Sequence, residues 1–164
     1  MHEPERFRSP AYLAVLDATP QSLCAQIDAV ALAAMRRIGE AGYPHERCGL
    51  LIGVIAAQGW TVVEAREVAN LNTERAADRF ELDPEGYRAI DRELRGSGRE
   101  IVGIFHSHPD APAKPSPTDL THAWEGFLYP IVAVQDGRAD EIRLWSLNEQ
   151  ATAFAEIELA RESA

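Results

Sequence analysis

Lysine is almost absent from this 164-residue chain, which carries a single Lys114 and fifteen arginines against 26 acidic residues. The resulting net charge of −10 argues against a nucleic-acid partner and against an anionic membrane surface. Apolar runs are all too short to span a bilayer, so no membrane segment is expected. The two cysteines, Cys24 and Cys48, form neither a disulfide framework nor a CxxC pair. Because the first residues also lack the pattern of a signal peptide, we expect a cytoplasmic protein.

The hydrophobic fraction of 46% and the periodicities that follow indicate a mixed α/β domain. We expect an N-terminal extension over residues 1–20, packed loosely or irregularly, and one domain over residues 21–160. Helical spacing predicts helices over 29–42, 85–96 and 118–127. Strand patterns cover 22–27, 48–57, 61–71, 79–83, 101–108, 129–135, 141–147 and 153–159, with Asp136-Gly137 as a hairpin turn.

Two histidines close the apolar run IVGIFHSH, at positions 106 and 108. Residues two apart in a strand point to the same face, so both imidazoles can converge on one point. Buried without partners, they would leave several polar atoms unsatisfied, whereas binding to a metal would satisfy them. Asp119 follows at the start of the next element. Two histidines and one carboxylate, with a fourth position for water, form the ligand set of a catalytic zinc site.

The residues around Asp119 also have a purely structural interpretation. Ser116-Pro-Thr-Asp119 matches a capping box with proline at the first helical position. The two interpretations are compatible, because a helix start is a rigid place from which to present a carboxylate. The sequence leaves open whether Ser116 caps this helix or faces a reacting carbonyl.

Glu46 stands directly before the buried CGLLIG strand, where it is suited to accept a proton from water activated by the metal. A surface charge at a strand edge is the structural alternative. The pair His45-Glu46 does not begin an HExxH motif, since Gly49 occupies the second histidine position. Cys48 is expected to be a small buried hydrophobe rather than a nucleophile.

Taken together, these residues match a known pattern: Glu46, then His106-Ser107-His108, seven residues, Ser116, two residues and Asp119. This arrangement resembles the JAMM (MPN+) family of zinc metallopeptidases, in its short prokaryotic single-domain branch. Pro44, CGLLIG and Gly103 agree with it, and the resemblance runs from about Ser22 to Leu147. It implies a curved mixed sheet flanked by helices, with a layout like that of cytidine deaminases. It also implies zinc on His106, His108 and Asp119, Glu46 as the proton acceptor and Ser116 as a hydrogen-bond donor to the oxyanion.

The family resemblance further implies hydrolysis of an amide or isopeptide bond after the Gly-Gly tail of a ubiquitin-like or sulfur-carrier protein. Sulfur transfer or cysteine biosynthesis would be the setting for such a short prokaryotic member. One alternative is a non-catalytic MPN-type binding module for ubiquitin-like partners, although such a module has no need of the complete residue set. Another is a zinc peptidase that acts on other peptides. The proline-rich 109–115 loop and the 70–83 segment are expected to flank the cleft.

Overall fold

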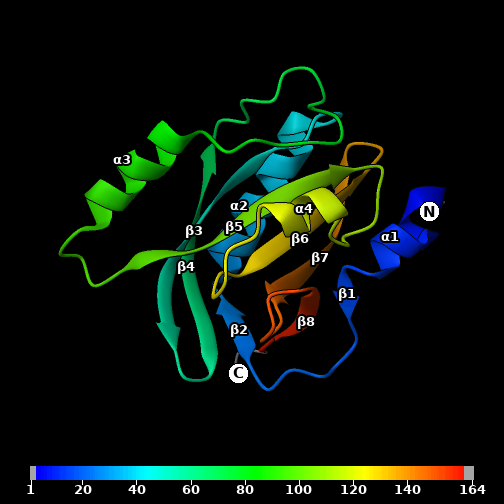
Figure 1. Ribbon diagram of the computed structural model, residues 1–164. Helices are drawn as coiled ribbons and strands as arrows, with labels where there is room; N and C mark the ends of the chain where they lie inside the picture. The colour runs from blue at the N-terminus through cyan, green and yellow to red at the C-terminus, as the bar shows by residue number, and fades with distance from the viewer. Residues whose placement is uncertain (1–2, 161–164) are drawn as a thin grey trace.

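The computed structural model describes residues 3–160 and is built on one mixed β-sheet (Figure 1). Its strands are β1 (Leu16–Asp17), β2 (Cys24–Ile27), β3 (Cys48–Ala56), β4 (Gly59–Val68), β5 (Glu100–Pro109), β6 (Tyr129–Gln135), β7 (Arg138–Leu147) and β8 (Phe154–Leu159). They lie in the order β1-β8-β2-β4-β3-β5-β6-β7, and a further β7–β8 pairing closes the sheet on itself. The predicted mixed α/β class with a curved sheet is confirmed.

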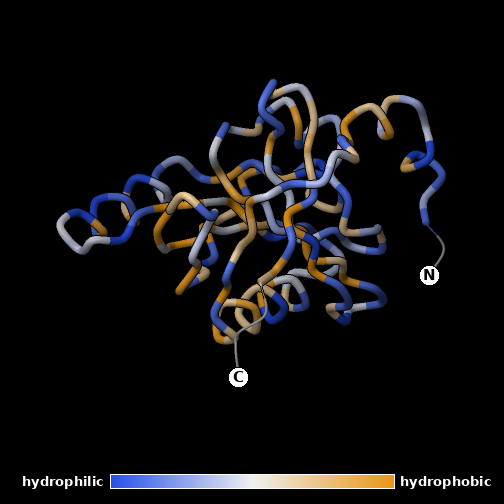
Figure 2. Tube along the Cα trace, turned by 90° about the horizontal axis from the view of Figure 1, so that it is seen from below, coloured by the Kyte–Doolittle hydropathy of each residue, from blue (hydrophilic) through white to orange (hydrophobic). Residues whose placement is uncertain are grey.

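Helix α2 (Ala29–Gly42), whose bounds agree with the prediction, covers one face of the sheet. Its small and apolar side chains, Ala31, Ala34, Met35 and Ile38, join the main core with side chains such as Leu51 and Phe105. On the other face, α3 (Pro84–Leu94) packs Tyr87, Ile90 and Leu94 against Leu50, Ile52 and Ile101 (Figure 1). Residues 48–53 of β3 and 101–108 of β5 are therefore covered on both faces, which explains their continuous apolar sequences, whereas residues 54–56 at the end of β3 are exposed. In Figure 2, hydrophobic stretches of the chain, in orange, pass through the middle of the molecule.

Two predicted elements differ most from the structure. The helix expected over 118–127 is the five-residue α4 (Pro117–Thr121). Residues 79–83, predicted as a strand, form only an isolated bridge between Asn70 and Leu82. The Asp136-Gly137 turn is present, with φ of 49° and 83°, as a two-residue hairpin with both central residues left-handed requires.

The N-terminal residues form short, irregular elements that are mostly exposed, in line with the expected loose or irregular packing, but two of their side chains are anchored in the domain. A 3₁₀ turn, η1 (Glu5–Arg8), and the short helix α1 (Pro10–Leu13) lead into β1, which pairs in parallel with β8. Phe7 and Val15 are buried. The domain boundary between residues 20 and 21 stays a prediction. Within residues 3–160, no helix has both the length and the apolar character needed to cross a bilayer.

Candidate metal centre and its cleft

The histidine pair lies near the end of β5, on the sheet face opposite α2. Alternation along the strand sends Phe105 into the α2 core, while His106 and His108 point the other way. The two imidazoles are 2% and 5% exposed, and their Nε2 atoms lie 3.0 Å apart. The predicted convergence of both rings on one point is therefore present.

Asp119 meets these rings from the first turn of α4. Its Oδ2 lies 3.4 Å from His106 Nε2 and 3.7 Å from His108 Nε2. The same oxygen accepts a hydrogen bond from the Ser116 backbone N–H at 2.8 Å, and Ser116 Oγ accepts one from the Asp119 N–H at 3.1 Å. The capping box is thus real and fixes the carboxylate next to the histidines. Because Ser116 Oγ only accepts in this cap, its own proton is free to donate elsewhere.

Glu46 reaches the same point because of the strand register between β3 and β5. In this antiparallel pair Cys48 is opposite His106, and Ser107 N–H donates to Arg47 C=O at 2.9 Å. Continuing that register places Glu46 opposite His108, on the same face of the sheet. Ligand atoms of Glu46, His106 and His108 all lie within 4.8 Å of one another. Since Glu46 is only 5% exposed, it is not the surface charge of the structural alternative.

Burial and mutual charge set the protonation of these groups in the absence of metal. Burial raises the pKa of Glu46, and the nearby His108 and His106 offset this only in part. Burial also acts to raise the pKa of Asp119, but the charge and hydrogen bonds of the two histidines outweigh it and hold that pKa well below its usual range. For His108, burial lowers the pKa, while Asp119 and Glu46 together outweigh it and leave the pKa raised. The pKa values of the two carboxyl groups, Glu46 and Asp119, are therefore shifted in opposite directions.

The donor set fits a zinc ion by its chemistry and spacing. Tetrahedral zinc with bonds of about 2.05 Å to nitrogen would hold two imidazole nitrogens roughly 3.3 Å apart; the observed separation is 3.0 Å. His108 Nδ1 donates to the Pro112 carbonyl at 2.8 Å, which leaves the Nε2 lone pair directed at the centre. His106 Nδ1 has no such partner among residues 3–160. Its ring is instead held by stacking on Phe80, with centroids 4.6 Å apart.

Cys48 lies opposite His106 but takes no part in this chemistry. Its side chain is fully buried, and its Sγ donates weakly to the Val68 carbonyl at 3.5 Å. Burial raises the pKa of the thiol to about 12, with the charge of Glu46 adding to the effect. A thiol of this kind is not ionised at neutral pH, so the expectation of a structural cysteine agrees with its environment.

A cleft of about 790 Å³ runs from the metal centre along the α3 and α4 side. Its lining includes His106 and Asp119 together with Phe80, Leu82, Tyr87 and Trp124, so it is largely apolar away from the centre. A second, smaller hollow of about 80 Å³ lies on the Glu46 and His108 side. Asp78, Arg79 and Ser116 line both spaces. The expected placement of the 70–83 segment and the 109–115 loop at the cleft is confirmed.

Several residues of the site carried no recognised signal in the sequence. The sequence pattern places Phe80 in a strand, but in the structure its ring stacks on His106. Asn70 makes four hydrogen bonds: its amide nitrogen donates to the carbonyls of Glu46 and Arg79, and its oxygen accepts from the backbone N–H groups of Asn72 and Glu81. An asparagine in a polar, irregular stretch is the one local hint of such a role. These bonds tie the 70–83 segment to the backbone of Glu46.

Comparison with known proteins places this chain among proteins of the family that its motif resembles. Residues 28–148 match the model of the prokaryotic homologs of the JAB domain. The desampylase of Haloferax volcanii is 41% identical over 105 residues, covering 62% of this chain and 72% of that protein. The CysO-cysteine peptidase of Mycobacterium tuberculosis is 30% identical over 110 residues, covering 66% and 73%. A solved structure from Desulfitobacterium hafniense superimposes with a TM-score of 0.72 at 22% identity, over 85% of this chain and 94% of that one. The chain belongs to the family of prokaryotic JAB-domain homologs.

Proposed function

We propose that this protein is a zinc-dependent metallopeptidase that hydrolyses the amide or isopeptide bond after the Gly-Gly tail of a ubiquitin-like or sulfur-carrier protein. The observation that carries the proposal is the convergence of two imidazole nitrogens and one carboxylate oxygen within 3.0 to 3.7 Å, beside the buried Glu46. His106, His108 and Asp119 would hold the metal. Glu46 and Ser116 would act on the substrate.

Zinc bound by these three side chains would supply Lewis-acid activation of water and of the scissile carbonyl. Glu46 would accept the proton of the attacking water and pass it to the leaving amine. Burial raises the pKa of Glu46 in the metal-free site, and a carboxyl group that is not held permanently ionised can both accept a proton and return it. The Ser116 hydroxyl, whose proton the helix cap does not use, would donate to the oxygen that becomes negative during attack.

The substrate class is supported by the relatives and by the shape of the cleft. Two relatives bear the names desampylase and CysO-cysteine peptidase. The cleft of about 790 Å³ is long and apolar enough to receive an extended tail, while the metal centre at its end is closed in by Phe80 and Asp119. Glycine, which has no side chain, suits such a close approach of substrate backbone to the site. Sulfur transfer or cysteine biosynthesis in the cytoplasm remains our predicted setting.

The decisive experiment uses a ubiquitin-fold sulfur carrier extended by one amino acid beyond Gly-Gly. Incubated with zinc-supplied protein, the carrier should lose the mass of that residue in intact-protein mass spectrometry. Glu46→Gln should lower the rate by a factor of about 10²–10⁴, the usual contribution of general acid–base catalysis. Glu158→Gln, at an exposed position on β8, is the matched control and should leave the rate unchanged.

The two alternative functions give different results in the same assay. A non-catalytic module for ubiquitin-like partners would bind the carrier without any change of mass, and Glu46→Gln would have no effect. A peptidase for other substrates would cleave short peptides at rates unrelated to the carrier. Unchanged mass with wild-type protein and bound zinc would contradict the proposed activity.

A further inference from the structure

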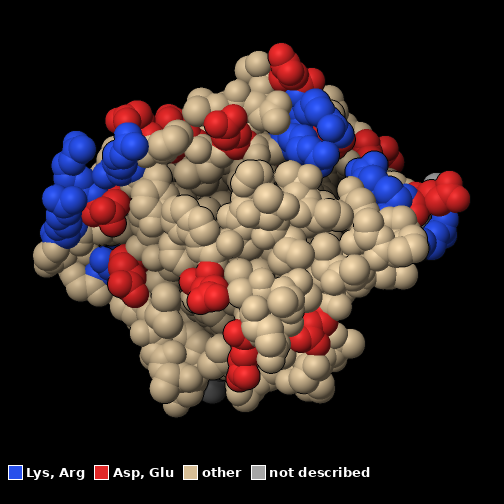
Figure 3. All heavy atoms as spheres, in the orientation of Figure 1, with Lys and Arg blue, Asp and Glu red and all other residues tan. Residues whose placement is uncertain are grey.

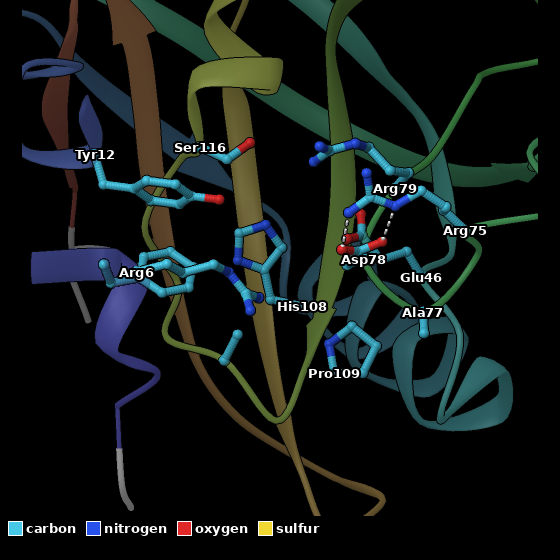
Figure 4. A pocket seen from close by; sticks show the side chains of 12 residues that line it. Arg6, Tyr12, Glu46, Arg75, Ala77, Asp78, Arg79, His108, Pro109 and Ser116 are labelled. Atoms are coloured by element: carbon cyan, nitrogen blue, oxygen red, sulfur yellow. Dashed lines mark hydrogen bonds and ion pairs between the residues drawn. The ribbon is translucent and has the colours of Figure 1, made fainter. Parts of the chain in front are cut away.

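One wall of the small hollow beside Glu46 and His108 is formed by N-terminal residues, which precede the region matched by the family model. Arg6, Phe7 and Tyr12 of η1 and α1 form that wall, while the family match begins at residue 28. In Figure 4, Arg6 and Tyr12 reach in from the N-terminal side, and Arg79 comes from the opposite side, on the 70–83 segment. The hollow thus combines the proposed proton carrier with side chains that lie outside the matched family region.

The N-terminal wall is fixed against the site by several contacts. The Phe7 ring is 5% exposed and lies 6.1 Å, between centroids, from the His108 ring and 4.9 Å from that of Tyr12. Lys114, in the loop that follows β5, forms an ion pair with Glu3 at 3.1 Å. Further along, the Phe154 N–H donates to the Val15 carbonyl at 2.7 Å. Arg6 is therefore presented from a packed segment.

The three arginines that line this hollow, Arg6, Arg75 and Arg79, outnumber its two carboxyl groups, Glu46 and Asp78, although the protein as a whole is strongly acidic. Arg75 is neutralised by an ion pair with Asp78 at 2.5 Å. Among residues 3–160, neither Arg6 nor Arg79 forms an ion pair with an acidic side chain. Hydrogen bonding to Arg75 holds the pKa of Asp78 below its usual value, and the charges of Arg79 and Arg6 add to this effect. Figure 3 shows basic side chains, interleaved with acidic ones, over the segment between β4 and α3 and over the N-terminal helices.

We propose that Arg6 and Arg79 bind the α-carboxylate of a single amino acid on the leaving side of the scissile bond. This inference rests on the proposed peptidase activity and makes the protein selective for a C-terminal residue over an isopeptide-linked lysine. The long cleft takes the acyl side, so the leaving amine lies towards Glu46 and the small hollow. At about 80 Å³ this hollow has the volume of a few water molecules and suits a small residue. Two guanidinium groups without acidic partners are suited to a carboxylate.

The test compares ligands that differ only in this carboxylate. Acetyl-Gly-Gly-Ala and its C-terminal amide are titrated by NMR into zinc-supplied protein carrying Glu46→Gln, where hydrolysis is suppressed and any residual cleavage is followed by mass. The acid should bind about tenfold more tightly than the amide, the size expected for charge-assisted hydrogen bonds at a partly exposed site. Arg6→Gln combined with Arg79→Gln should reduce the ratio to near one. Arg95→Gln, at an exposed position after α3, should preserve the ratio.

In parallel, kcat/KM is measured with otherwise wild-type enzyme for a carrier ending in Gly-Gly-Ala, for its C-terminal amide and for an isopeptide-linked lysine. Preference for the acid, lost in the Arg6 and Arg79 double variant, supports the inference. Equal binding of acid and amide, or binding of neither, overturns it. So does an equal loss of kcat/KM for the acid and the amide form of the carrier in the double variant, which would place the arginines against a part of the carrier other than its terminal carboxylate. An acid preference in binding without any hydrolysis would instead contradict the proposed function and leave the carboxylate site standing.

Discussion

Two carboxylates approach the histidine pair, and metal-dependent stability decides which of them completes the metal site. His106 and His108 lie within 3.7 Å of Asp119 Oδ2, but Glu46 also meets them within 4.8 Å. We assign Asp119 as the ligand because the capping box fixes its Oδ2 3.4 and 3.7 Å from the two Nε2 atoms, and we assign Glu46 as the proton acceptor. Zinc should therefore stabilise the Glu46→Gln variant but hardly the Asp119→Asn variant.

The expected size follows from linkage and chain length. At free zinc one hundred times above Kd, binding to the folded state adds about 2.7 kcal/mol. For 164 residues, with roughly 2.1 cal/mol/K of unfolding entropy per residue, this raises Tm by about 8 °C. If loss of Asp119 weakens binding about a hundredfold, the same zinc concentration adds only about 0.4 kcal/mol, or roughly 1 °C.

Differential scanning calorimetry with zinc and with a chelator measures both shifts. Wild type and Glu46→Gln should each show the large zinc-dependent rise, and Asp119→Asn the small one. The amide side chain in the Asp119→Asn variant keeps an oxygen that can accept the Ser116 N–H, so loss of the cap alone does not explain its response. The reverse result, with the zinc response lost in Glu46→Gln and retained in Asp119→Asn, would refute the assignment of ligand and base.

Three further predictions concern the groups around the centre. Because burial raises the pKa of Glu46, its ionised form destabilises the metal-free fold above its ordinary pKa near 4.5. Glu46→Gln in chelator should therefore be more stable than wild type at pH 7, with the gain vanishing towards pH 4 in urea unfolding. Ser116→Ala should lower kcat by a factor of about 10²–10³, because an oxyanion donor is lost, and should lower the free energy of unfolding by about 1 kcal/mol, because the helix cap is lost. A variant with normal kcat but reduced stability would leave Ser116 only its capping role. Asn70→Ala should destabilise the protein by about 1–3 kcal/mol. It should also lower kcat more than it changes KM, because the backbone of Glu46 loses its hydrogen bond to the Asn70 amide. Unchanged kinetics would show that the 70–83 segment does not position Glu46.

The secondary structure was predictable where periodicity and end signals agree. Helix α2 begins after Asp28 and ends at Gly42 as its pattern indicates, and β6 keeps its predicted bounds. The helix after Ser116 has a clear start, but its end carried no signal in the sequence. The N–H of Trp124 donates to the Tyr129 hydroxyl at 2.6 Å, so the backbone leaves the helix there. This hydrogen bond joins the segment after α4 to a strand, and no local pattern contains it.

In the site, too, the features that follow from local sequence patterns were predictable, and those that depend on contacts between distant residues were not. The convergence of His106 and His108 follows from a period of two, and the position of Asp119 from a capping box. The stretch around Phe80 failed as a strand because Asn70 takes the backbone groups of Arg79 and Glu81 that a strand partner would need. The N-terminal wall depends on contacts more than a hundred residues apart, between Glu3 and Lys114. Such contacts leave no trace in a local sequence pattern.

The place of Glu46 shows how strand register converts separate sequence features into one site. Side chains alternate between faces along a strand, so a shift of one residue between β3 and β5 would turn Glu46 towards α2 and away from His108. Two features hold the register. Gly49 has no room for a Cβ, which would lie 2.1 Å from the Arg66 carbonyl and 2.5 Å from the Phe105 ring. The irregularity in the β3–β5 pairing lies between Leu51 and Ile52, beyond the paired residues nearest the site. Close packing of this strand pair is therefore a condition of the chemistry, because it places the carboxylate and the imidazoles on the same face.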